Sequence, residues 1–252
     1  NISCTLEYDY TDWCMARLAE WLGKEGDRAH FDKRALSYAT IFDPESGWFR
    51  PRNEKGVFSS LPEKGRLQEG YGCVESNPYQ QGWFVPHDVE GMIRLMGGDK
   101  SFVSKLDSLF TMHLPAEFFA QTEDVTEEGL LGGYVHGNEP SHHVIYLYNK
   151  VGQPWKTQKY VAEVLHNLYQ NAPDGICGNE DCGQMSGWYI LSSLGIYSVC
   201  PGSNEFALTT PLFEKAVVNL ANRKTLTILA NNPKKNVYIT KVELNGQPID
   251  VN

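Results

Sequence analysis

The sequence has no apolar run that approaches the roughly 20 residues a membrane-spanning helix needs. It is also poor in positive charge: 22 Lys and Arg stand against 31 Asp and Glu in 252 residues, a formal net charge of -9. Nucleic acid and anionic membrane surfaces are therefore poor partners. The sequence predicts no nucleic-acid partner and no membrane span, and it favours a neutral polar ligand or a cation.

Cysteine is scarce as well, with six residues. Six are too few for a disulfide scaffold of this size, and none are spaced as Cys-x-x-Cys, which argues against structural zinc. Cys177 and Cys182 are close enough in sequence to be bridged, or they are two small buried thiols. The chain starts without a charged-then-apolar leader, and it is either processed or cut from something longer.

Aromatic residues are abundant at 12%, and the hydrophobic fraction of 41% can form a sizeable core. Apolar spacing of three and four predicts helices at 5–23, 29–42, 86–97, 101–113, 140–150, 154–170 and 184–194. Short β-rich runs separated by turn residues follow. We expect a mainly α fold, with a helical domain over 1–200 and a small antiparallel β segment over 201–252. The aromatic helices favour pairs around a barrel axis, with the site at the loop end.

The segment 71–88 gathers acid, amide, aromatic and histidine side chains, among them Glu75, Tyr79, Trp83, His87 and Asp88. Such a set suits a sugar, whose C–H faces stack on rings while its hydroxyls bond to polar tips. Glu75 is flanked by small and apolar residues. If it is buried there, its pKa would rise, as a general acid requires; the alternative is a surface glutamate before a turn.

The segment 136–143 holds three histidines with Asn138 and Glu139. Zinc would prefer the histidines, and calcium would prefer the Asn and Glu oxygens. Since His142 and His143 are adjacent, they would point about 100° apart on a helix, which argues against their binding one ion together. The alternative is that a histidine caps or packs a helix.

The segment 175–188 places Asn179, Glu180 and Asp181 between glycines, just ahead of a predicted helix. A helix N-terminus stabilises a carboxylate and keeps its pKa low, which is the setting for a general base. The alternative is ordinary N-capping by Asp181. One acid in an enclosed loop and one ionised acid at a helix start would form the pair that glycoside hydrolysis needs.

Five segments carry a resemblance to a known family: CTLEYDYTDWCMARLAEWLGK, VESNPYQQGWFVPHDV, GNEPSHHVIYLYN, GQPWKTQ and GNEDCGQMSGWYILSSLGIYSVCPGS. In order, and over nearly the whole chain, they resemble glycoside hydrolase family 92. Its members are calcium-dependent exo-acting α-mannosidases common in gut Bacteroides-like bacteria. The resemblance implies a hydrolase of α-mannoside glycans that serves carbohydrate metabolism and N-glycan degradation. It also implies a periplasmic, cell-surface or secreted location.

Members of this family resemble one another in an N-terminal β-sandwich followed by an (α/α)6 barrel, and they invert the anomeric configuration. Ca2+ is described as binding mannose O2 and O3 and distorting the ring. Such a barrel has twelve helices, and the sequence predicts about seven. The resemblance therefore implies part of the barrel, from the C-terminal catalytic part of a longer protein. The N-terminal sandwich would be its missing partner, and the chain alone would be an inactive fragment with exposed apolar surface.

The resemblance also implies roles for matching residues. Glu75 matches the general acid and Asp181 the general base, while Trp13 matches a tryptophan that lines the mannose subsite. Asn138 and Glu139 match the leaving-sugar subsite and are the expected calcium ligands. Members with α-1,2 specificity carry His-Glu-Pro there, so Asn138 argues against that linkage. The residues expected to bind substrate are Trp13, Tyr79, Trp83, His87, Asp88, Asn138, Glu139, His142 and Asn179, although many members have Trp in place of Tyr79.

Two other hypotheses remain open. A non-catalytic sugar-binding remnant of the same fold would tolerate loss of Glu75 and Asp181, and both are present. Another (α/α)6 enzyme, such as a glucan phosphorylase or a trehalase-like hydrolase, is the second alternative. No phosphate-binding Gly-rich loop or basic cluster supports the phosphorylase.

Overall fold

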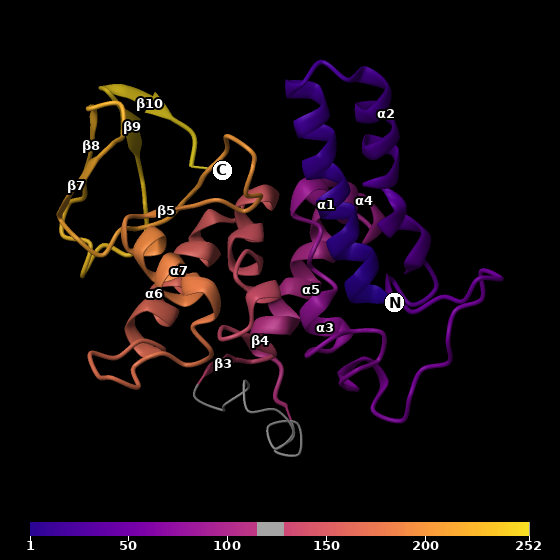
Figure 1. Cartoon of the computed structure of the whole chain (residues 1–252). Helices are drawn as coiled ribbons and strands as arrows, with labels where there is room; N and C mark the ends of the chain where they lie inside the picture. The colour runs from indigo at the N-terminus through magenta and orange to yellow at the C-terminus, as the bar shows by residue number, and fades with distance from the viewer. Residues whose placement is uncertain (115–128, 252) are drawn as a thin grey trace. The chain divides into compact units, whose positions relative to one another are not determined.

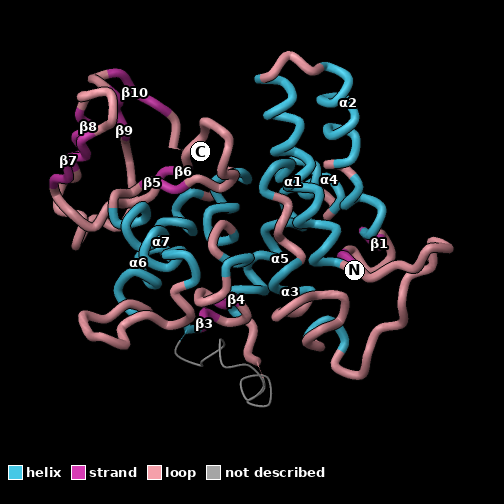
Figure 2. Tube along the Cα trace, viewed as in Figure 1, coloured by secondary structure: helices cyan, strands magenta, loops and turns pink. Residues whose placement is uncertain are grey.

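A computed structural model describes residues 1–114 and 129–251 of the chain (Figure 1). The chain divides into two compact units, Asn1–Thr122 with Leu131–Val135, and Glu123–Leu130 with His136–Asn252. In this described part, helices carry most of the regular structure, and the strands occur as short antiparallel pairs (Figure 2). The predicted mainly α fold is confirmed. Within the described ranges, no helix is long and apolar enough to cross a membrane.

The first unit opens with two long helices that pack against each other, α1 (Ile2–Trp21) and α2 (Glu25–Arg34). The side chain of Asn1 caps α1, because its Oδ1 accepts the N–H of Cys4 at 3.1 Å. One face of α1 is buried and includes Ile2 and Leu6, whereas α2 has no buried residue. Apolar burial therefore fixes α1 in the core but cannot by itself hold α2.

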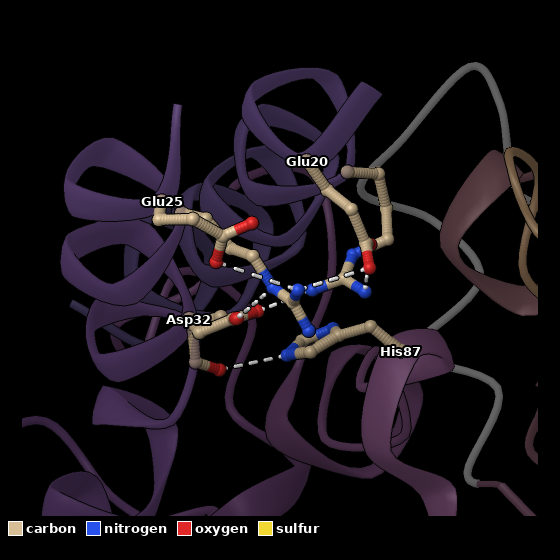
Figure 3. Close-up of polar contacts among 7 residues, drawn as sticks. Glu20, Glu25, Asp32 and His87 are labelled. Carbon is tan, nitrogen blue, oxygen red and sulfur yellow. Dashed lines mark hydrogen bonds and ion pairs between the residues drawn. The ribbon is translucent and has the colours of Figure 1, made fainter. Parts of the chain in front are cut away.

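Ion pairs align α2 on α1 (Figure 3). Arg17 on α1 lies 2.8 Å from Glu20 and 2.5 Å from Asp32, and Arg28 on α2 lies 3.1 Å from Glu20 and 3.5 Å from Asp32. Arg28 also lies 3.7 Å from Glu25. Exposed pairs of this kind contribute at most about 1 kcal/mol each, so the network selects the register of the two helices more than it stabilises the unit.

The other elements of the first unit surround an aromatic core. They are η1 (Ser37–Ile41), β1 (Phe42–Asp43), β2 (Trp48–Phe49), η2 (Gly65–Leu67), α3 (Pro78–Gln81), η3 (Pro86–Asp88), α4 (Val89–Leu95) and α5 (Asp99–Thr111). In the core, Trp83 meets Trp48 edge to face at a centroid distance of 5.2 Å and Phe102 at 5.4 Å. These side chains are essentially inaccessible to solvent.

The second unit is built on η7 (Val144–Val151), α6 (Pro154–Asn167) and α7 (Gln184–Ser193). Tyr146 stacks on Tyr197 at 4.5 Å, and its hydroxyl lies 2.6 Å from Ser192 Oγ. The shorter elements are η6 (Glu139–Ser141), η8 (Asp181–Gly183), β5 (Ile196–Tyr197), β6 (Ala207–Leu208), β7 (Lys215–Asn219), β8 (Thr225–Leu229), β9 (Val242–Leu244) and β10 (Gln247–Ile249). β3 (Leu130–Leu131) and β4 (Tyr134–Val135) form a further pair, and all of it except Leu130 belongs to the first unit.

Several details differ from the expectation. The segment after residue 200 forms separate two-stranded pairs, not one sheet, because β6 pairs back with β5 while β7–β8 and β9–β10 pair locally. The predicted helix 140–150 is formed by two 3-10 segments. α5 begins at Asp99, after the left-handed Gly98, and Ser101 lies inside it. None of the six cysteines is in a disulfide, Cys177 and Cys182 included. The proposed domain boundary at residue 200 stays a prediction.

The β1–β2 hairpin is held by a charged pair. Arg50 Nη1 donates to Asp43 Oδ2 at 2.7 Å, and the backbone N–H groups of Glu45 and Ser46 donate to the same carboxylate at 3.1 and 3.3 Å. The hydrogen bond from Arg50 holds the pKa of Asp43 at about 2, although burial of the carboxyl opposes the shift.

We expect Asp43→Asn to change how stability depends on acid. The folded-state pKa lies below the value of about 3.9 for an unfolded Asp, so the stabilisation by ionised Asp43 is present above about pH 4 and is lost as the pH falls toward 2. Urea denaturation across this range should show the native protein losing more free energy of unfolding than the variant. Parallel pH profiles would contradict the assignment.

Candidate functional site

The loop that carries Glu75 is anchored to the first turn of α1. The carbonyl of Gly72 accepts the N–H of Ile2 at 2.6 Å and that of Ser3 at 3.2 Å, and the N–H of Val74 donates to Ser3 Oγ at 2.9 Å. The first N–H groups of a helix have no acceptor inside the helix. The loop satisfies two of them, and α1 thereby fixes the backbone just before Glu75.

The short helix α3 anchors the other side of this loop. Asn77 Oδ1 accepts the N–H of Tyr79 at 2.9 Å and that of the following residue at 3.2 Å. The indole N–H of Trp48 donates to the carbonyl of Pro78 at 2.8 Å, and that of Trp83 donates to the carbonyl of Tyr79 at 2.8 Å. The aromatic core therefore holds α3 through two indole hydrogen bonds.

Trp83 and Tyr79, both predicted to bind substrate, occupy different environments. Trp83 is 0% exposed, so its placement favours support of α3 from the core over direct contact with a sugar. Tyr79 is half-buried, and the guanidinium of Arg66 lies 5.6 Å from its ring centroid. Only the second of these rings offers surface to a ligand.

Glu75 is exposed, so the structure agrees with the alternative of a surface glutamate and not with a buried one. Its backbone is left-handed, with φ of 51°. This conformation costs a residue with a Cβ about 1–2 kcal/mol, and it persists only where the surroundings determine it. The hydrogen bonds at Gly72 and at α3 fix the backbone on either side of Glu75 and so hold it in this conformation. The role of Glu75 as general acid stays a prediction.

A row of partly exposed rings lies on α1 and η3. Trp13 stacks on Tyr10 at a centroid distance of 6.1 Å, and Tyr10 stacks on His87 at 6.2 Å. Phe84 meets Tyr10 edge to face at 5.9 Å. This half-buried row is the kind of surface on which a sugar ring stacks. Tyr10 was not among the predicted residues, although its i, i+3 spacing to Trp13 places both on one helix face.

One ring nitrogen of His87 makes a hydrogen bond, and the other has no hydrogen-bond partner in the described part of the chain. Its Nε2 lies 2.8 Å from the carbonyl of Ala35 (Figure 3). A carbonyl only accepts, so Nε2 carries the proton and Nδ1 of the neutral ring is an acceptor. Nδ1 is buried and has no hydrogen-bond partner within the described ranges. Burial lowers the pKa of His87, which favours this neutral form.

Asp88 is engaged in the structure of the neighbouring helix. Its Oδ1 accepts the N–H of Gly91 at 2.9 Å and so caps α4, and its Oδ2 accepts the hydroxyl of Tyr38 at 2.6 Å. Burial, and then this hydrogen bond, raise the pKa of Tyr38. Tyr38 in turn meets the ring of His87 edge to face at 6.0 Å. Asp88 therefore holds Tyr38 against the ring of His87.

Glu7 is a second carboxylate connected to the Glu75 loop, and the sequence interpretation missed it. Gln81 Nε2 donates to Glu7 Oε1 at 3.2 Å, and Gln81 Oε1 lies 3.2 Å from Ser76 Oγ. Partial burial raises the pKa of Glu7. The sequence could have indicated Glu7, because it lies three residues before Tyr10 and so on the face of α1 that carries the aromatic row.

In the second unit, two glycines let two candidate loops approach each other. A Cβ on Gly178 would lie 2.4 Å from the Cα of Gly137, and a Cβ on Gly137 would lie 2.6 Å from the carbonyl oxygen of Cys177. Such an approach requires that neither residue has a side chain. The crossing brings the backbone before Asn138 against the backbone before Asn179, so two segments identified separately in the sequence are neighbours.

Glu180 caps the first turn of α7, and Asp181 does not. Glu180 Oε1 accepts the N–H of Ser186 at 3.2 Å, and Oε2 accepts its hydroxyl at 2.5 Å. These hydrogen bonds lower the pKa of Glu180. Asp181 is exposed between Glu180 and the left-handed Cys182, whose φ is 53°. The capping function considered for Asp181 therefore belongs to its neighbour. Asn179 is exposed in the same loop.

The buried histidines of the second unit are packing residues. His142 Nε2 donates to the carbonyl of His136 at 2.8 Å, and the indole N–H of Trp188 donates to the carbonyl of His142 at 3.1 Å. Burial lowers the pKa of His142 to about 4 and that of His136 well below its usual range. Both rings are therefore neutral at pH 7. His142 was predicted to bind substrate, and its burial favours support of the Asn138 loop instead.

Asn138 and Glu139 lie at the start of η6, where Asn138 is buried and Glu139 is exposed. Their side-chain oxygens are the donor type that Ca2+ prefers. Two side chains are fewer than the six to eight oxygens that calcium takes. Within residues 1–114 and 129–251, no group of three or more His, Cys, Asp or Glu could hold a metal ion. The donor chemistry fits calcium, and the other ligands would be backbone, water or sugar oxygens.

The comparisons with known proteins agree on one family. The model of the glycosyl hydrolase family 92 catalytic domain matches residues 1–252. A family GH92 α-mannosidase from Bacteroides thetaiotaomicron is 40% identical, with a TM-score of 0.89 over 99% of this chain and 31% of its own. A GH92 inverting mannosidase from the same species is 36% identical, with a TM-score of 0.85 over 99% of this chain and 34% of its own.

A more distant relative extends the match. An uncharacterized secreted glycosidase from Arthroderma benhamiae is 28% identical over 98% of this chain and 32% of its own length. The chain thus spans about a third of the length of the relatives it matches. With these matches over its whole length, the chain belongs to glycosyl hydrolase family 92, within the catalytic domain.

The left-handed backbone of Glu75 predicts an inverted order of stability for two substitutions. At ordinary positions Ala is more stable than Gly by about 0.5–1 kcal/mol. At Glu75 we expect Glu75→Gly to be more stable than Glu75→Ala by about 1 kcal/mol, because only glycine adopts this φ without strain. Chemical denaturation of both variants measures the difference. The ordinary order, Ala above Gly, would show that the residue is not held in this conformation.

Proposed function

We propose that the protein removes α-linked mannose from the ends of glycans by inverting hydrolysis, with Glu75 as general acid and Asp181 as general base. Family membership over residues 1–252 is the observation that carries this proposal. Two exposed carboxylates on separate loops, Glu75 and Asp181, support it. The relatives described as α-mannosidases, one of them inverting, support the reaction class.

The two carboxyl groups have different roles in an inverting hydrolysis. One carboxylic acid protonates the leaving oxygen, and the other, as carboxylate, activates a water on the opposite face of the sugar. The two groups then lie about 6.5–9.5 Å apart, which leaves room for the water. Glu75 belongs to the first unit and Asp181 to the second. The proposal therefore requires that the complete protein bring both loops to one sugar.

We propose that the row of Trp13, Tyr10 and His87 forms part of the mannose subsite. A sugar face would stack on the aromatic surface, and Nδ1 of His87 would accept a hydroxyl. This assignment is supported by the missing hydrogen-bond partner of Nδ1 within the described ranges. Asn138, in the Asn-Glu-Pro sequence of the leaving-sugar subsite, argues for a linkage other than α-1,2.

Calcium is proposed as the cofactor, held with the help of Asn138 and Glu139. When bound, the ion would supply a positive charge that orders sugar hydroxyls. The chain's own contribution is a buried amide and an exposed carboxylate, positioned by η6 and by the buried histidines behind it. Residues 179–181 would lie beside this calcium site, because the close approach of Gly137 and Gly178 brings the two loops together.

The descriptions of the relatives support a proposal for where the enzyme acts. One relative is described as secreted, and those from Bacteroides thetaiotaomicron are bacterial. We propose a bacterial enzyme that acts in the periplasm, at the cell surface or outside the cell, and that takes part in N-glycan degradation. Because the relatives are about three times as long, we also propose an N-terminal β-sandwich in the complete protein.

Glu75→Gln tests the general acid. In the complete enzyme we expect a loss of about 10²–10⁴-fold on a mannobioside, whose leaving group needs a proton. The loss on an aryl mannoside with an activated leaving group should be much smaller. Glu54→Gln, a change at another exposed glutamate of the first unit, is the matched control and should leave both rates unchanged. Equal losses on the two substrates would remove Glu75 from this role.

A chelator tests the cofactor. Treatment of the complete enzyme should abolish turnover of mannobiosides while circular dichroism stays unchanged, and added Ca2+ should restore the rate. Asn138→Ala should raise the calcium concentration that half-restores activity, whereas Asp174→Asn, at an exposed acid of the same unit, should not. Full turnover in chelator would contradict the calcium assignment.

A further inference from the structure

A buried glutamine connects α1 to the loop that carries Glu75. α3, whose last residue is Gln81, packs against α1 (Figure 1). The side chain of Gln81 donates through Nε2 to Glu7 Oε1 at 3.2 Å, and its Oε1 accepts the hydroxyl of Ser76 at 3.2 Å. Gln81 is 1% exposed and Ser76 is 3% exposed. A buried amide needs partners for both of its ends, so Glu7 and Ser76 together hold the side chain of Gln81 in place.

The hydroxyl of Ser76 also reaches across Glu75. Ser76 Oγ donates to the carbonyl of Val74 at 3.0 Å, so this hydrogen bond closes a turn around the residue between them. The N–H of Val74 donates to Ser3 Oγ at 2.9 Å, which ties the turn to α1. Glu75 has its left-handed φ of 51° inside this turn. A strained residue keeps its conformation only where its neighbours determine it, and Ser76 supplies one of those contacts.

Glu7 determines which way the amide of Gln81 points. An ionised carboxylate only accepts hydrogen bonds, so it binds the NH2 end of the amide and turns the carbonyl end toward Ser76. The carbonyl end then accepts the hydroxyl of Ser76. Without an acceptor at residue 7, neither orientation of the amide satisfies both of its ends, and the side chain is no longer held against Ser76. Glu7 therefore acts on the turn around Glu75 through two buried side chains.

We infer that Glu7 is a positioning residue for the general acid: through Gln81 and Ser76, it keeps Glu75 in the conformation that protonates the leaving oxygen. The inference rests on the proposed role of Glu75. Because Glu7 acts through other side chains, its loss should slow the step that needs the proton and leave substrate binding unchanged. This separates Glu7 from Trp13 and Tyr10 on the same helix, whose loss should weaken binding.

The dependence on the leaving group tests the inference in the complete enzyme. Glu7→Ala removes the acceptor, and we expect kcat on a mannobioside to fall about tenfold with KM unchanged. The loss on an activated aryl mannoside should be much smaller, because its leaving group needs little protonation. Glu7→Gln keeps an acceptor oxygen at the same place and should keep most of the rate. Glu25→Ala, at a glutamate whose side chain is 75% exposed on α2, is the control and should leave both rates unchanged.

An exchange of the two side chains gives a second readout. Gln81→Glu alone places two carboxylates against each other and should lower kcat on the mannobioside more than Glu7→Gln does. Combining Gln81→Glu with Glu7→Gln restores an NH2 group that faces a carboxylate, and the second oxygen of residue 81 can still accept from Ser76. The double variant should therefore be faster than Gln81→Glu alone.

Several outcomes would overturn the inference. They are equal losses of Glu7→Ala on the two substrates, a rise in KM alone, no loss, or a double variant no faster than Gln81→Glu. Glu75→Gln, measured on the same two substrates, separates this result from a failure of the proposed function. If only the loss caused by Glu75→Gln depends on the leaving group, Glu7 alone loses its role. If neither loss depends on it, the acid assignment falls and the inference falls with it.

Discussion

The carbonyl of Gly72, which accepts the first backbone N–H groups of α1, is the contact on which the candidate site of the first unit depends. It joins the loop of Glu75 to the one helix that also carries Glu7, Tyr10 and Trp13. A helix N-terminus needs outside acceptors, so the loop and the helix satisfy each other. The loop of Glu75 and the rings on α1 are therefore held together, although about sixty residues separate Glu75 from Tyr10 and Trp13 along the chain.

Backbone geometry, more than charge, shapes both candidate acids. Glu75 lies in the left-handed region, and Asp181 directly precedes a left-handed residue, Cys182. In the second unit, a close approach of Gly137 and Gly178 sets the position of the neighbouring loops. Such features cost free energy and are retained where surrounding contacts determine them. Their coincidence with the two carboxylates that the family motifs single out supports a functional origin.

The sequence predicted features that follow from a repeating apolar face, and it did not predict features that depend on loop geometry. Helical periodicity predicted α1, α6 and α7 well, because buried apolar faces repeat with the helix. It missed the break between α2 and η1, where no buried face exists to signal the helix. The burial of Trp83 was not predicted, and packing of His142 was only one of two alternatives, since an aromatic or histidine ring suits a core and a sugar site equally. The use of Glu180 as the cap depended on the exact loop geometry, which adjacent acids in a sequence do not reveal.

The central claim is that two carboxylates on separate loops catalyse a single displacement by water. The stereochemistry of the first product tests it most directly. Proton NMR of the complete enzyme acting on an α-mannoside, recorded before mutarotation, should show β-mannose as the initial product. Initial α-mannose would indicate a retaining reaction through a covalent intermediate, in which the carboxyl groups lie about 5–5.5 Å apart, and would contradict the account.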